Sequence, residues 1–241
     1  MEKRTKGSES LYLPSGTEKR TKGSESFCLP SGTTPSQEPR NKKDMNKKDM
    51  NKKDMKRLAT RKKIVDAATH LFARLGYHKT TIQDIAQRIG MTTGAVFHHF
   101  GSKNDILDTV VEELSSNLER YIEFLDGPHQ DFRAMVAGLT EIFVHRYRHD
   151  PDSIIGLTSL SAEFSGIRDP IIVNIQSAYD RFVDAFERAM NRFSKNPAHR
   201  GAGICFIAAL QGVAIQALLR GDEISIEELV NGFTALANGD L

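Results

Sequence analysis

Small and polar side chains follow one another from Thr92 to Ala95, and Phe97, His98 and His99 come one residue later. Thr92 is a good N-cap, so Thr93 begins a helix whose first turn carries no large side chain. Such a helix start can approach a nucleic-acid groove closely, where a bulky side chain would collide. Adjacent histidines on a helix point apart and no third ligand lies near them, so the sequence predicts no metal site. No nucleophile–base pair and no phosphate-binding loop occurs either, so we expect neither an enzyme nor a cofactor.

A preceding helix and a turn position this segment. Apolar residues recur at helical spacing from Ile82 to Ile89, and Thr81 with Asp84 forms a capping box at the start. Gly90 lies where the chain must turn, because glycine adopts left-handed backbone angles at little steric cost. The pattern predicts a helix-turn-helix whose second helix, Thr93 to Phe100, reads DNA.

The flanking sequence makes this motif more specific. Upstream, an amphipathic helix carries Ile64, Val65, Ala68, Leu71, Phe72 and Leu75; downstream, Ser102 and Asp105 open another helix. The whole stretch, IVDAATHLFARLGYHKTTIQDIAQRIGMTTGAVFHHFGSKNDIL, resembles the N-terminal domain of the TetR family of transcriptional regulators. The resemblance covers residues 58–108, which is less than a quarter of the chain.

The resemblance implies roles for ten residues of this segment. It places Thr81 and Gln83 against phosphate or a base edge, and Lys103 against phosphate. The groove-facing start of the reading helix is Thr92, Thr93, Gly94 and Ala95, and the aromatic cluster that grips the DNA backbone is Phe97, His98 and His99, with His99 as the packing member. The family usually has tyrosine where this chain has Phe97, so one hydrogen bond to phosphate is missing here.

Charge is divided unequally along the chain. The net charge of +2 is the balance of +6 in residues 1–56, +6 in residues 57–104 and −10 in residues 105–241. A basic head on an acidic body is expected if only the head meets phosphate. We therefore divide the chain into a tail (residues 1–55), a DNA-binding head (56–104) and a body (105–241).

The tail is repetitive and polar. EKRTKGSESLYLPSGT at 2–17 returns as EKRTKGSESFCLPSGT at 18–33, and NKKDM occurs three times between Asn41 and Met55. Little apolar surface is available to offset the entropy of ordering, so the composition predicts disorder. Two interpretations remain: a basic arm that adds non-specific DNA affinity, or a duplicated leader with translation starting at Met45, Met50 or Met55.

The body reads as helix throughout, which gives an all-α fold of about nine helices with a long linking helix after the head. Asp150–Pro151, Asp169–Pro170 and Asn196–Pro197 mark three helix starts, and Ser225 with Glu228 marks the last helix, which extends its apolar stripe to Leu236. Gly201 to Leu219 is 19 residues without a charge, long enough to span a membrane. Its two glutamines and many small residues favour burial within the protein and against a partner subunit, so we expect no membrane association.

The resemblance also implies a homodimer and a small-molecule inducer. The last two helices, about Pro197–Leu219 and Ser225–Ala237, are the implied dimer surface, although the small residues in the first also suit packing within one subunit. The implied effector pocket is lined by Phe143, Tyr147, Leu160, Glu163, Phe164, Tyr179, Phe182 and Phe186, each of which also fits an ordinary core position. If Glu163 is buried there, it favours a cationic ligand.

Two functional hypotheses follow. The first is a cytoplasmic, nucleoid-associated, homodimeric repressor that binds a pseudo-palindromic DNA operator and is released by an unknown small molecule; an activator of the same family is a variant of it. The second is a helical small-molecule-binding protein whose DNA-binding head is a relic. Unchanged operator affinity after Gln83→Ala plus Thr93→Ala would favour the second.

Overall fold

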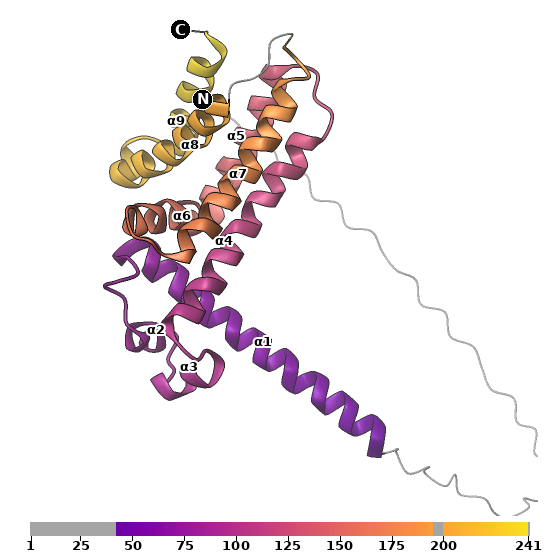
Figure 1. Cartoon of the computed structure of the whole chain (residues 1–241), viewed down its shortest axis with the longest axis vertical. Helices are drawn as coiled ribbons and strands as arrows, with labels where there is room; N and C mark the ends of the chain where they lie inside the picture. Colours follow the sequence, from indigo (N-terminus) through magenta and orange to yellow (C-terminus); the bar gives the residue numbers. More distant parts are fainter. Residues whose placement is uncertain (1–41, 195–199, 241) are drawn as a thin grey trace, which may run out of the picture.

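The computed structural model describes residues 42–194 and 200–240. This part of the chain contains nine α-helices, one 3-10 turn and no strand, which confirms the all-α prediction (Figure 1). The helices are α1 (Lys42–Leu75), α2 (Ile82–Arg88), α3 (Thr93–His99), α4 (Lys103–Asp126), α5 (Phe132–His149), α6 (Pro151–Phe164), α7 (Pro170–Met190), α8 (Arg200–Arg220) and α9 (Ile226–Asn238), with the 3-10 turn at Gly221–Glu223.

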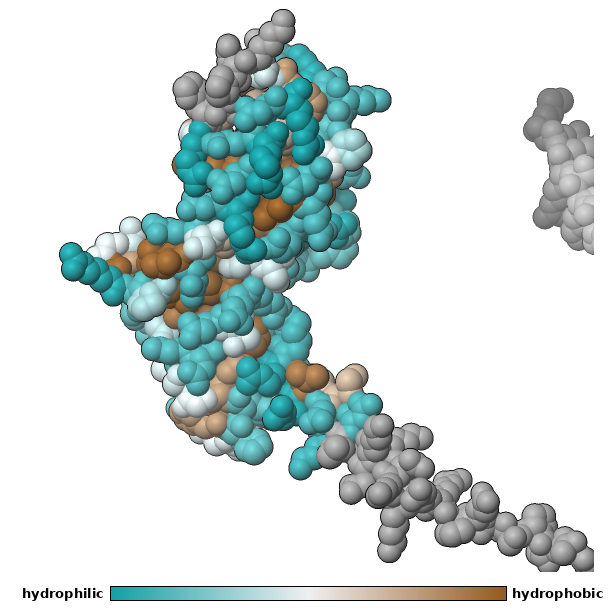
Figure 2. Space-filling model, turned by 45° about the vertical axis from the view of Figure 1, so that its right-hand side comes forward, coloured by the Kyte–Doolittle hydropathy of each residue, from teal (hydrophilic) through white to brown (hydrophobic). Residues whose placement is uncertain are grey.

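Helix α1 is longer than the sequence pattern predicts. The tail was expected to be disordered through residue 55, whereas residues 42–55 are the first turns of this 34-residue helix. Lysine and methionine are good helix formers, and neither glycine nor proline interrupts residues 42–75. The helix leaves the head as a rod (Figure 1), and every residue from Asn51 to Ala59 is exposed, Met55 and Leu58 included (Figure 2). Residues 1–41 of the predicted tail lie outside the described residues.

The head consists of the second half of α1 with α2 and α3. The predicted starts are confirmed: Thr81 and Asp84 form a complete capping box, and the Thr92 hydroxyl accepts a hydrogen bond from the Ala95 N–H. Gly90 has a φ of +66°, so it supplies the left-handed turn between α2 and α3. Leu75, predicted to face the core, is 54% exposed because it is the last residue of α1, just before the chain turns.

Head and body share one hydrophobic cluster. Side chains of α1, α2 and α3 pack with the start of α4 and with α6 and α7; the body contributes Leu157, Leu160, Phe164, Ile171 and Ile175. A second cluster fills the rest of the body, where α4 and α7 lie side by side along much of their length (Figure 1). The head is thereby fixed to the body through α1 against α6 as well as through the continuous helix α4.

Several apolar residues of helix α8 are not covered by other parts of the described chain. By length and composition it is the one helix of the described residues apolar enough to cross a membrane, and 28% of its most apolar stretch is buried. Its predicted start at Asn196–Pro197 lies outside the described residues. In α9, Leu236 was predicted to be buried but is 67% exposed, on the side that faces away from the cluster.

Candidate functional site

The predicted reading helix α3 presents its small and polar residues to solvent. Thr92, Thr93, Gly94 and His98 are exposed, and Phe97 is 51% exposed although it is aromatic. Val96 is fully buried and Phe100 nearly so, which anchors the opposite side of the helix in the head. Ala95 and His99 are half-buried, while Thr81 and Gln83 lie exposed around the start of α2. Seven of the ten predicted DNA-contacting residues are therefore on the open surface of the head.

Helix α3 has only seven residues and is held at both ends. Its N-terminus is capped by Thr92, and at its C-terminus the Arg61 guanidinium donates a hydrogen bond to the His99 carbonyl and lies 3.9 Å from the Phe100 ring centroid. A cation there also complements the helix dipole. Burial, followed by the charges of His98 and Arg61, lowers the pKa of His99. His99 is thus favoured in its neutral form, and its backbone carbonyl is tied to Arg61 of α1.

Lys103 is half-buried where the α1–α2 loop meets the start of α4. Its ammonium group donates hydrogen bonds of 2.8 Å to the carbonyls of Tyr77 and Thr80, and it sits 4.0 Å from the centroid of the Tyr77 ring. Burial lowers its pKa, and the Glu163 carboxylate opposes this. The lysine therefore fastens the α1–α2 loop (residues 76–81) to the start of α4, and its phosphate contact stays a prediction.

Glu163 lies at the junction of head and body. Its two carboxylate oxygens accept hydrogen bonds of 2.6 Å from the backbone N–H groups of Tyr77 and His78. Gly76, with a φ of +90°, leaves room for the carboxylate, since a Cβ at this position would lie 3.1 Å from Glu163 Oε2. Glu163 was predicted to line an effector pocket and, if buried there, to favour a cation; it is not among the residues that line the cavity described below, and its carboxylate joins α6 to the α1–α2 loop.

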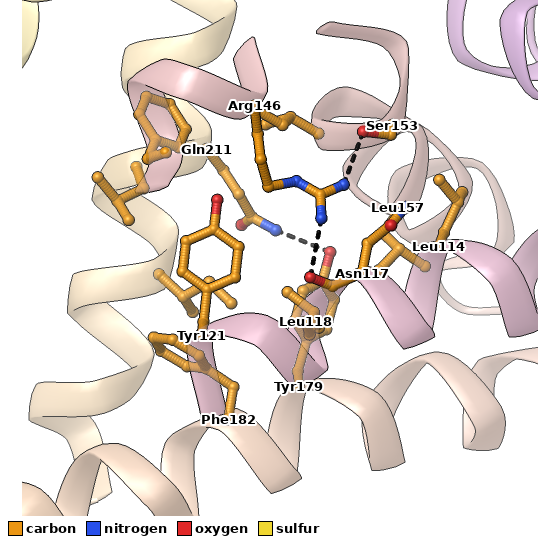
Figure 3. A pocket seen from close by; sticks show the side chains of 14 residues that line it. Leu114, Asn117, Leu118, Tyr121, Arg146, Ser153, Leu157, Tyr179, Phe182 and Gln211 are labelled. Atoms are coloured by element: carbon orange, nitrogen blue, oxygen red, sulfur yellow. Dashed lines mark hydrogen bonds between the residues drawn. The ribbon is translucent and has the colours of Figure 1, made fainter. Parts of the chain in front are cut away.

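The body contains a cavity of about 60 Å³ between α4, α5, α6, α7 and α8 (Figure 3). Three of the eight predicted lining residues, Phe143, Tyr179 and Phe182, lie in its wall. Leu160 and Phe164 pack in the first hydrophobic cluster against α1, Phe186 stacks near Phe206, and Tyr147 faces the surface beside α9. The buried side of each helix is longer than the part that lines the cavity, so these residues lie at ordinary core or surface positions.

Polar residues of the cavity were missed by the sequence analysis. Arg146 donates hydrogen bonds of 2.9 Å to the Asn117 carbonyl and the Ser153 hydroxyl, and Gln211 donates one of 2.7 Å to the Tyr179 hydroxyl (Figure 3). The signal was present: Leu139 and Phe143 are buried on α5, and Arg146 continues their stripe at a spacing of three residues. Burial raises the pKa of Tyr121 to about 12, so its phenol is neutral at physiological pH.

The comparisons with known proteins agree with this arrangement. Residues 64–110 match the model of bacterial regulatory proteins of the tetR family. The chain is 34% identical over 115 residues to the HTH-type transcriptional repressor Rv1474c of Mycobacterium tuberculosis, which covers 44% of this chain and 61% of that relative. The chain thus spans about three fifths of Rv1474c, less than two thirds of its length.

A longer match is to the HTH-type transcriptional regulator BetI of Escherichia coli, 34% identical over 171 residues, covering 64% of this chain and 85% of BetI. The fold is shared with a transcriptional regulator from Saccharomonospora viridis solved in complex with choline, with a TM-score of 0.56, 22% identity, and coverage of 75% of this chain and 96% of that one. The head motif, the helical body and the match along most of BetI lead to one conclusion: the chain belongs to the TetR family of transcriptional regulators.

Proposed function

We propose that this chain is a homodimeric, ligand-responsive repressor that binds a pseudo-palindromic operator in the bacterial cytoplasm. The observation that carries the proposal is the exposed face of α3, where Thr93, Gly94, Phe97 and His98 lie open while Val96 anchors the helix. A helix presented in this way enters the major groove with its first turn. Rv1474c, a relative of this chain, is named as a repressor, which supports repression rather than activation.

The proposed dimer surface is the uncovered side of α8 and α9. Ile204, Ala208, Ile215 and Leu219 form an exposed stripe along α8 at successive spacings of four, seven and four residues, and Leu236 extends the apolar surface on α9. An apolar surface of this kind is typical of subunit interfaces. Two heads held at a fixed separation would then read half-sites about 34–36 Å apart.

The cavity supports a response to a small molecule. Three of the helices that line it are in contact with the head or its supports: α4 continues from the head, α6 packs on α1, and α7 packs along α4. A ligand that widens the cavity would displace these helices and change the separation of the two heads. The choline complex of the S. viridis regulator supports a ligand site in this fold.

Binding of the full chain to genomic fragments from around its own gene, sequenced over a series of salt concentrations, tests DNA recognition. We expect an inverted repeat and a steep salt dependence. Gln83→Ala plus Thr93→Ala should weaken operator binding at least tenfold through loss of about two hydrogen bonds, whereas the exposed body variant Gln176→Ala should not. Recovery of fragments without a common sequence would contradict the proposal.

Light scattering coupled to size exclusion tests the dimer. Ile215→Glu places a charge on the proposed surface and should give monomers that lose operator binding. Val173→Glu adds the same charge to an exposed residue of α7 and should leave the dimer intact. A dimer that persists in the Ile215 variant would place the subunit contact elsewhere.

A further inference from the structure

We infer that the cavity binds a small organic anion, a monocarboxylic acid with an aromatic or branched apolar body, and that Arg146 holds its carboxylate. The inference rests on the proposed function and specifies the ligand class of the same cavity. The observation behind it is a guanidinium group directed into a mostly apolar cavity (Figure 3). It replaces the cationic ligand that Glu163 had suggested.

The partners of Arg146 are neutral. Its two terminal nitrogens donate to the Asn117 carbonyl and the Ser153 hydroxyl, and within the described residues it forms no ion pair. Arg146 is half-buried, and burial of a charge is costly unless an opposite charge compensates it. The fork of a guanidinium matches a carboxylate in shape and charge, so a bound acid would supply the missing anion.

The two carboxylates that flank Ser153 on the same stretch of chain make other contacts. Asp150 caps α6 by accepting a hydrogen bond of 3.2 Å from the Ser153 N–H, and Asp152 pairs with His70 and Arg74 on α1. No acidic residue is among the described residues that line the cavity. A cationic ligand would meet Arg146 with no counter-charge, so the cavity selects against it.

The rest of the wall defines the body of the ligand. Leu114, Phe143, Leu157, Phe182 and Leu210 provide apolar surface on several sides. The Tyr121 hydroxyl makes no hydrogen bond to a described residue and lies in the same wall, so it can donate a second hydrogen bond to the acid. The volume of about 60 Å³ is far below the 300 Å³ or more of ordinary ligand pockets, so the ligand is small and its lining helices move apart to admit it.

Isosteric probes test the charge preference on the full-length protein. Benzoate, benzamide and benzamidine share one shape and carry a negative, a neutral and a positive group; pivalate and pivalamide repeat the comparison with a branched body. Binding is measured by calorimetry and by the shift in melting temperature. We expect at least one acid to bind about tenfold tighter than its amide, from the greater strength of charged hydrogen bonds, and benzamidine to bind more weakly than benzamide.

Arg146→Gln should reduce binding of the acid about tenfold and leave that of the amide within a factor of two. The matched control is Arg168→Gln, which removes an exposed arginine outside the cavity. The inference is overturned if no acid binds wild-type protein more tightly than its amide, if benzamidine binds as well as benzoate, or if the Arg146 variant keeps the preference. The wild-type comparison stands even if that variant fails to fold.

Operator binding is measured in parallel on ligand-free protein. An operator that is bound but released only by neutral or cationic compounds would overturn this inference and leave the proposed function intact. Absence of any operator would overturn the proposed function, whatever the acids do.

Discussion

Replacing Glu163 with glutamine tests whether this residue joins the body to the head. Both carboxylate oxygens are in use, each accepting a 2.6 Å hydrogen bond from a backbone N–H of the α1–α2 loop. Glutamine keeps one carbonyl oxygen but turns an amide NH₂ toward the second N–H. One hydrogen bond is therefore lost, and the other is no longer charge-assisted.

The size of the effect follows from these two contacts. Hydrogen bonds to charged groups contribute about 1.5–3 kcal/mol, and the lower end applies here because the carboxylate is half-buried and the contact with His78 is exposed. Losing one bond and weakening the other should cost about 1–2 kcal/mol of unfolding free energy. For a chain of this length, that lowers the melting temperature by about 2–8 °C.

Urea unfolding at one fixed protein concentration measures the free energy, and hydrogen exchange measures the amides of Tyr77 and His78. We expect at least one of these two amides to exchange faster in the variant. The exchange rates of amides at the centre of α7 should change only by the amount that the change in global unfolding free energy explains. Glu112→Gln is the control, since Glu112 is exposed on α4 and far from this loop. Unchanged exchange at both amides, with stability within about 0.3 kcal/mol of wild type, would refute the role of Glu163 as a strut.

Three further predictions concern the head and the cavity. Phe97→Tyr should raise operator affinity several-fold, because the new hydroxyl of this exposed ring can donate to a phosphate; filter binding with operator DNA measures it. Arg61→Gln should weaken operator binding more than Arg57→Gln does, since both remove one positive charge but only Arg61 holds the C-terminus of α3; equal losses would show that charge alone matters. Tyr121→Phe should flatten the loss of stability between about pH 10 and pH 12. The folded chain holds the Tyr121 proton more tightly than the unfolded chain does. The contribution of the protonated phenol to the unfolding free energy is therefore complete below pH 10 and falls as the pH rises to about 12. Urea titrations of wild type and variant across this range measure the difference.

Sequence reasoning predicted the elements of this fold well where a local signal defines them. Capping residues such as Thr81, Thr92 and Ser102 begin helices in the structure because each satisfies N–H groups within a few residues of itself. Leu75 and Leu236 were wrongly predicted to be buried. Periodicity shows which side of a helix is apolar, but it does not show where the neighbouring elements that cover this side end.

The cavity was harder to predict because it depends on contacts between distant segments. Glu163 occurs among apolar residues of α6, which suggested burial in a pocket, but its partners lie 85 residues or more earlier in the chain. Lys103 resembles a phosphate-contacting lysine in sequence, and only the fold brings it to the Tyr77 and Thr80 carbonyls. In both cases the hydrogen-bond partners come from another segment of the chain, so the local pattern does not identify them.

The hydrophobic cluster that crosses from head to body limits how this protein can be recombined. Exchanging DNA-binding modules between regulators is an obvious route to new specificities, and a cut after residue 104 would follow the charge boundary. Such a cut would leave α1 without Leu157, Leu160 and Phe164, which complete its core from α6. A functional chimera therefore has to carry the α1-facing residues of α6 together with the head. Among related proteins, the residues on the two sides of this contact should vary together.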